Sequence, residues 1–310
     1  PLDEPRLRSA IAGIHAGGST NLSGGWLRAL EQLRGSRGKI LLLTDGIANV
    51  GVTDRGALTE LARSAAREEV GTTTIGFGAD FDEELLTAMA DAGGGNAHWA
   101  ASPDDAPSIF ARELEGLTSV AAQNVSLEVR PGPHVEIVGV LNDYPHLAVP
   151  GGIQLELGDA YAGETRRIVL GLHVPDVAAL GPVSVAELVV RWTSVGDGIA
   201  QHALTLPVVV NAVSAEEAAA AAPDPDVREE VLVLQAARAR DEAIRLADAG
   251  EHMNAKNLLL AREADLRALG LKAEADELHA AAATVEPDHY DGMTRKRLHY
   301  RSQQAKRGRP

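Results

Sequence analysis

Two short segments of the chain carry side chains that could do chemistry together. They are Gly17-Gly18-Ser19-Thr20 and Leu43-Thr44-Asp45-Gly46. Asp45 directly follows the short apolar run at residues 39–44, which we interpret as a strand buried on both faces. Open α/β sheets bind their ligands at the carboxyl ends of their strands, and Asp45 is predicted at such an end. Thr20 is expected to point its hydroxyl across the same crevice from a glycine-rich loop.

Hydroxyl and carboxylate oxygens are hard donors, which suit Mg²⁺, Mn²⁺ or Ca²⁺ better than softer ions. Thr20 and Asp45 are therefore candidate metal ligands. Such ions prefer roughly six ligands, so water, further protein oxygens or a partner carboxylate must complete the site. The competing interpretation is structural: Asp45 would cap a turn, and Thr20 would cap the helix that contains Trp26.

Other kinds of site find little support in the sequence. The absence of cysteine excludes disulfides, thiolate zinc sites, iron–sulfur clusters and a cysteine nucleophile, although it does not assign a compartment. The ten histidines lack H-x-x-x-H spacing, the glycines at 76–78 do not complete a dinucleotide loop, and no G-x-S-x-G elbow occurs. We interpret Asn49 as a turn residue and His98 and Trp99 as core residues near the crevice.

The composition describes an acidic, globular protein of more than one domain. The chain has 310 residues, 45% of them hydrophobic, and a formal net charge of −15. That length predicts two or three domains. The charge argues against a nucleic-acid partner, and no apolar run is long enough to predict a membrane-spanning helix.

The pattern of apolar residues divides the chain into four segments. Residues 1–120 alternate helical and strand-like runs, which predicts an α/β domain with a parallel sheet. Residues 121–213 contain short alternating runs between Pro and Gly turns, which predicts an antiparallel β-sandwich. Residues 214–294 are predicted to be helical, with helix ends at Gly250 and Gly270. Residues 295–310 hold seven Lys or Arg and no acid, so we expect a disordered basic tail.

Longer stretches of the sequence carry a family resemblance. Residues 1–120 look like the C-terminal two-thirds of a von Willebrand factor type A domain, through GGSTNLSGG, KILLLTDGIANVG, TTIGFGADFDEELL and GGGNAHWAASPDDAPSIFARELEGL. Within that family, the sequence resembles in particular the bacterial proteins that are related to Ca-activated chloride channels and inter-α-trypsin inhibitor heavy chains. LNDYPH and LELGDAYAGETRRIVL also resemble the β-domain that follows in those bacterial proteins.

This resemblance implies a Rossmann-like domain with a metal-ion-dependent adhesion site. In that family three loops supply the ligands: Asp-x-Ser-x-Ser, a Thr and an Asp. Thr20 matches the second loop and Asp45 the third, whereas no Asp-x-Ser-x-Ser occurs in the chain. We therefore expect the chain to begin inside the domain, with an incomplete metal site and sheet. The strand at residues 39–44 should then be an exposed apolar edge.

The preferred hypothesis is a non-enzymatic binding module. A divalent cation held by Thr20 and Asp45 would recruit an acidic side chain of a partner protein as its last ligand. Metal and partner would then raise each other's affinity. The alternatives are a regulatory subunit or hydrolase that uses the same crevice, and a purely structural assembly platform.

Overall fold

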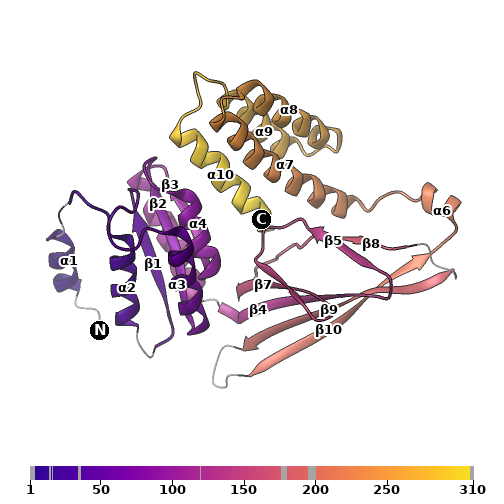
Figure 1. Cartoon of the computed structure of the whole chain (residues 1–310), viewed down its shortest axis with the longest axis horizontal. Helices are drawn as coiled ribbons and strands as arrows, with labels where there is room; N and C mark the ends of the chain where they lie inside the picture. The colour runs from indigo at the N-terminus through magenta and orange to yellow at the C-terminus, as the bar shows by residue number, and fades with distance from the viewer. Residues whose placement is uncertain are drawn as a thin grey trace.

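The computed structural model describes residues 4–13, 15, 17–33, 36–118, 120–175, 180–194 and 200–307. In chain order they form an α/β region, a region of antiparallel sheets and a helical region (Figure 1). This is the predicted order of fold types. Among the helices of the described ranges, none is both long enough and apolar enough to cross a membrane.

The α/β region alternates helices and strands, as the spacing of its apolar runs predicts. Asp54 and Asp82 begin two of the helices by accepting hydrogen bonds from the backbone N–H groups of Ala57 and Leu85 at 2.8 and 2.9 Å. The elements are α1 (Glu4–Ala12), α2 (Leu22–Gln32), β1 (Gly38–Thr44), α3 (Arg55–Arg67), β2 (Val70–Phe77), α4 (Glu83–Ala92), β3 (Gly94–Ala100), the 3₁₀ turn η1 (Pro103–Asp105) and α5 (Ala106–Thr118).

The parallel sheet has the order β1-β2-β3, so β1 is an edge strand, as predicted. Its burial is less complete than the continuous apolar run predicts. Ile40 and Leu42 are buried, but the side chain of Leu43 on the other face remains 43% exposed. The prediction of burial on both faces is therefore wrong at the carboxyl end of β1, close to Asp45.

The core of this region lies between the sheet and helices α2, α3 and α4. Trp26 of α2 is fully buried there, and its indole N–H donates a hydrogen bond to Thr72 Oγ1 at 3.1 Å. Leu58 and Met89 are also fully buried in the same cluster. Tyr300, from a distant helix, belongs to this core as well, so the C-terminal part of the chain helps to complete the α/β region.

The middle region consists of two antiparallel sheets. The larger has the order β10-β9-β4-β7-β6, and β5 pairs with β8 in the smaller. Apolar side chains of both sheets, including Leu127, Leu155, Ile137 and Leu170, pack in one cluster. The strands are β4 (Val120–Pro131), β5 (Glu136–Val140), β6 (His146–Val149), β7 (Gly152–Tyr161), β8 (Leu170–His173), β9 (Gly181–Ser194) and β10 (Gln201–Ala212).

The helical region packs around small residues and leucines. Pro225 occupies the first turn of its longest helix, behind Asp224 as the N-cap, and this position suits a residue without an N–H. Gly250 and Gly270 follow two helices with φ of +83°, the left-handed backbone that ends helices. The helices are α6 (Ala215–Ala220), α7 (Pro225–Asp248), α8 (His252–Ala268), α9 (Lys272–Thr284) and α10 (Gly292–Lys306).

The expectation of a disordered basic tail at 295–310 is wrong for its described part. Residues up to 306 belong to α10, which lies between the α/β region and α7 (Figure 1); residues 308–310 lie outside the described ranges. Leu298 and Tyr300 are buried, and basic side chains of α10 pair with acids of the other regions. Counting charges within the segment alone overlooked partners on the rest of this acidic chain.

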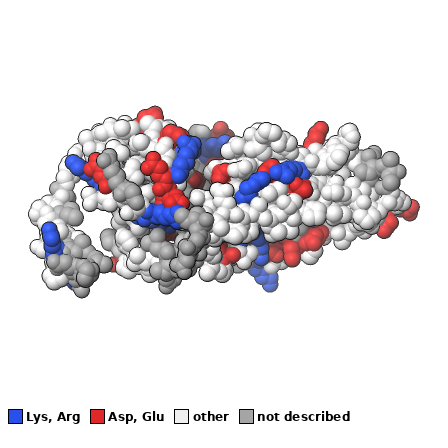
Figure 2. Space-filling model, turned by 90° about the horizontal axis from the view of Figure 1, so that it is seen from below, with Lys and Arg blue, Asp and Glu red and all other residues white. Residues whose placement is uncertain are grey.

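Charged side chains of both signs are interspersed on the face seen in Figure 2. Lys and Arg lie beside Asp and Glu, with broad uncharged areas between them. The excess of acids, which gives the formal net charge of −15, is therefore not gathered into one continuous acidic surface on this face.

Candidate functional site

The structure brings the Thr20 loop against the turn that follows β1. Thr20 precedes α2 and is half-buried, whereas Asp45, one residue beyond β1, is exposed. A Cβ atom on Gly46 would lie 3.1 Å from the hydroxyl oxygen of Thr20, so that hydroxyl faces the backbone next to Asp45. The carboxylate of Asp45 makes no hydrogen bond or ion pair with the described residues, which leaves it free for a ligand.

Asn49 connects the two loops. Its side-chain oxygen accepts a hydrogen bond from the Thr20 backbone N–H at 2.8 Å. In return, the backbone N–H groups of Asn49 and Val50 donate to the Thr20 carbonyl at 3.1 and 3.3 Å. The sequence prediction of a turn residue missed this role, because the partner lies 29 positions away and no local pattern reports it.

A second set of contacts, made by residues that follow Thr20 in the chain, joins the same two loops. Asn21, rather than Thr20, caps α2, because its side-chain oxygen accepts from the Gly24 N–H at 2.8 Å. Ser23 Oγ accepts from the backbone N–H of Val52 at 2.9 Å. Gly51 completes this contact with a φ of +77°, since a Cβ there would lie 2.4 Å from Ser23 Oγ.

The oxygen ligands at this site have the chemistry that a hard divalent cation prefers, but there are too few of them to complete its coordination. Thr20 and Asp45 offer a hydroxyl and a carboxylate oxygen, the ligands that Mg²⁺ and Ca²⁺ accept. Within the described residues, no group of three or more acidic or histidine side chains is placed to hold a metal ion. This chain would therefore supply about two of the roughly six ligands, which predicts weak binding by the chain alone.

A different polar cluster, which the sequence analysis did not identify, is buried between the sheet and α5. The carboxylate of Glu113 accepts hydrogen bonds from Lys39, Thr73 and Asn96 at 2.9, 3.0 and 2.8 Å. Nε2 of His98 lies 2.7 Å from the same carboxylate. Only 8% of the Lys39 side chain and 3% of the Glu113 side chain are exposed, so this ion pair is withdrawn from water.

The surroundings of Glu113 keep it ionised. Burial alone would raise the pKa of Glu113, but the hydrogen bond with His98 and the charge of Lys39 outweigh it and hold the pKa well below its usual range. A carboxylate in this state, with both oxygens engaged, is a poor proton acceptor. His98, expected in the apolar core, is thus part of a polar cluster that ties β1 and β3 to α5.

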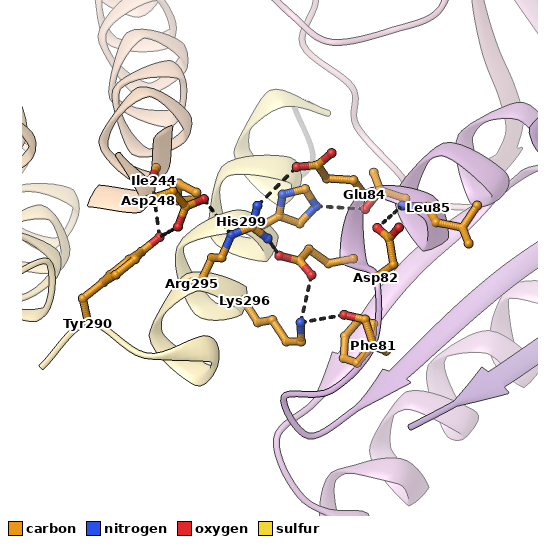
Figure 3. A network of polar contacts seen from close by, with 12 residues as sticks. Phe81, Asp82, Glu84, Leu85, Ile244, Asp248, Tyr290, Arg295, Lys296 and His299 are labelled. Atoms are coloured by element: carbon orange, nitrogen blue, oxygen red, sulfur yellow. Dashed lines mark hydrogen bonds and ion pairs between the residues drawn. The ribbon is translucent and has the colours of Figure 1, made fainter. Parts of the chain in front are cut away.

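Helix α10 makes a third polar arrangement, across the boundary with the α/β region. Lys296 donates to the Phe81 carbonyl and to Glu83 Oε2, both at 2.8 Å, and its ammonium lies 4.2 Å from the centre of the Phe81 ring. Arg295 pairs with Glu83, and with Asp248 of α7 at 3.0 Å (Figure 3). Two adjacent basic residues thus join α4 to α7.

The far end of α10 meets the region of antiparallel sheets. Lys306 pairs with Asp241 of α7 and, at 3.0 Å, with Asp143, which precedes β6. The Tyr144 hydroxyl donates to the Arg307 carbonyl at 2.5 Å, and Arg307 pairs with Asp91 of α4. All three regions are therefore in contact around the end of α10.

Comparison with known proteins gives structural and sequence relatives of this chain. No model of a known protein family matches the chain. A solved von Willebrand factor type A protein from Catenulispora acidiphila aligns with a TM-score of 0.73 over 95% of this chain and 72% of that chain, at 16% identity. E3 ubiquitin-protein ligase WAV3 of Arabidopsis thaliana is 26% identical over 322 residues, which cover 97% of this chain and 40% of that protein.

Inter-alpha-trypsin inhibitor heavy chain H1 of Sus scrofa is 29% identical over 184 residues, 56% of this chain and 20% of that protein. The chain spans less than half the length of both curated relatives. The resemblance drawn from the residues is thereby confirmed. The chain has the fold of von Willebrand factor type A proteins, and its sequence is similar to the inter-alpha-trypsin inhibitor heavy chains.

Proposed function

We propose that the chain is a protein-interaction module without catalytic activity, and that a divalent cation at Thr20 and Asp45 captures an acidic side chain of the partner. One observation carries this proposal. Cross-loop hydrogen bonds to Asn49 bring the Thr20 hydroxyl to the end of β1, where the Asp45 carboxylate is exposed and free of partners among the described residues. The fold shared with von Willebrand factor type A proteins supports the same function.

The weakness of the site is part of the mechanism. Thr20 and Asp45 would hold a cation by two oxygens, and the remaining positions would be filled by exchangeable water. A carboxylate arriving from a partner adds charge-assisted ligation, so metal and partner are bound more tightly together than separately. The chain's own residues position the two oxygens, and no chemical step on the partner is required.

Calorimetric titration of the chain with Mn²⁺ and Mg²⁺ tests this proposal, first alone and then with acetate as a simple carboxylate probe. We expect affinity on the order of millimolar without acetate and tighter binding with it. Asp45→Ala should abolish the heat of binding, whereas Asp104→Ala, at an exposed acid in η1, should leave it unchanged. Equal binding by both variants would contradict a site at Asp45.

An enzymatic function has less support from the geometry. A hydrolytic site needs a general base within reach of a nucleophile. Glu113, a deeply buried carboxylate of this region, has both oxygens occupied by protein donors and a lowered pKa. The assembly-platform hypothesis has one observation in its favour, because α10 contacts all three regions and holds them together.

A further inference from the structure

A cavity of about 780 Å³ lies at the meeting point of the three regions, separate from the loops of Thr20 and Asp45. Its walls come from β3 and α5 of the α/β region, from Tyr161 of β7, and from α7, α9 and α10. A volume of several hundred cubic ångströms is typical of sites for small molecules. The cavity also lies between regions, where such sites often occur.

The notable group in this cavity is the guanidinium of Arg240 on α7. Arg240 is only 6% exposed, yet its guanidinium makes no hydrogen bond within the described part of the chain. Its nearest acid is Glu277 of α9, at 3.6 Å. Burial lowers the pKa of Arg240 below its usual value; the charges of Glu277 and Asp241 oppose this shift, and the charge of Arg301 adds to it.

Glu277 cannot satisfy Arg240 alone, because it is shared. Its Oε1 lies 3.5 Å from Arg301 on α10, while Oε2 faces Arg240. Two guanidinium groups therefore converge on one carboxylate at distances too long for strong hydrogen bonds. A guanidinium offers five N–H donors in a planar fork that matches carboxylate and phosphate oxygens.

Several other polar groups of the lining already have partners within the protein. Glu113 is paired with Lys39, Tyr161 accepts a hydrogen bond from Lys39, and Arg307 is paired with Asp91. When these pairs are set aside, the lining carries the three arginines 112, 240 and 301 against the two glutamates 274 and 277. Within this lining the arginines thus outnumber the glutamates by one, and Arg240 remains without a hydrogen-bond acceptor among the described residues.

We infer that this cavity binds a small molecule through a phosphate or carboxylate group. The buried Arg240 and the more exposed Arg301 would both donate hydrogen bonds to that group. The bound oxyanion supplies the hydrogen-bond acceptors that Arg240 lacks. Because its walls come from three regions, an occupied cavity also stabilises their arrangement by mass action. This inference is independent of metal binding at Thr20 and Asp45.

Thermal unfolding of the full chain tests the inference. Sodium phosphate, pyrophosphate and citrate are titrated separately, against sodium chloride at matched ionic strength. At least one of these anions should raise the unfolding midpoint saturably, and calorimetry should give a dissociation constant. The phosphate and citrate series distinguish a phosphate-bearing from a carboxylate-bearing ligand.

Variants then locate the site. Arg240→Gln and Arg301→Gln should each weaken binding about tenfold or more, since each removes charge-assisted hydrogen bonds. Arg301 has a 58% exposed side chain, so its variant should fold even if Arg240→Gln does not. Arg245→Gln, at a 73% exposed position of the same α7, is the matched control and should bind normally. Absence of saturable stabilisation by all three anions, or equal binding by Arg301→Gln and Arg245→Gln, overturns the inference.

Discussion

The hydrogen bonds of single residues decide whether Thr20 and Asp45 can act together. The two residues lie in loops that are far apart in sequence and share no secondary structure. Asn49 joins the loops by both its side chain and its backbone, and Ser23 adds a further bond to Val52. The position of the candidate ligands therefore depends on residues that would not themselves bind a cation.

Asn49→Ala should loosen the Thr20 loop. The substitution removes the acceptor of the Thr20 N–H, at a cost of about 1 kcal/mol for one lost hydrogen bond. Hydrogen exchange should show a faster Thr20 amide, and Mn²⁺ binding should weaken. Asn254→Ala, on α8, removes an exposed hydrogen bond to the preceding Glu251 and should change neither. An unaltered Thr20 exchange rate would show that Asn49 does not hold the loop.

The pair of Lys39 and Glu113 is the residue-scale feature with the greatest expected effect on stability. Glu113→Gln leaves the Lys39 ammonium buried without its counter-charge, so we expect a loss of about 3–5 kcal/mol in urea unfolding. Lys39→Met combined with Glu113→Gln should be less destabilising than the sum of the two single changes, because neither charge is then left alone. Additive effects of the two substitutions would contradict a coupled pair.

At the scale of elements, α10 is where the sequence prediction failed most clearly. The alternation of helices and strands, and the helix ends at Gly250 and Gly270, could be predicted from the sequence because local interactions determine them. The role of α10 was not, since Leu298 and Tyr300 bury their side chains against elements distant in sequence. For the same reason neither the Glu113 cluster nor the cross-loop bonds of Asn49 could be predicted.

Lys296→Met should weaken the docking of α10 on the α/β region. The ammonium of Lys296 is almost completely buried, and its loss removes hydrogen bonds to Glu83 and to the Phe81 carbonyl. We expect a loss of about 2–4 kcal/mol in unfolding free energy and faster proteolysis of α10. Arg297→Met, at the neighbouring exposed position, is the matched control. Equal protease resistance of the two variants would show that Lys296 is dispensable for docking.

At the scale of the whole molecule, α10 makes the three regions depend on one another. One of its sides belongs to the core of the α/β region, and its last turn binds α7 and the segment before β6. A change at the boundary of α10 and α4 should therefore affect the stability of the chain as a whole. His299, which lies on this boundary within 3.0 Å of Thr87 Oγ1, provides a way to test this by pH alone.

Burial lowers the pKa of His299 to about 4, below the ordinary value of 6.5. The unfolded chain therefore binds a proton near pH 6.5 that the folded chain resists until about pH 4, so this group makes stability fall as the pH decreases through that interval. The full interval corresponds to up to about 3 kcal/mol. His299→Gln should flatten the pH dependence of urea unfolding between these limits, whereas His173→Gln, at an exposed position of β8, should preserve it. If both variants keep the slope of the unaltered chain, His299 is not protected from protonation in the folded state, and α10 does not exclude water from this boundary.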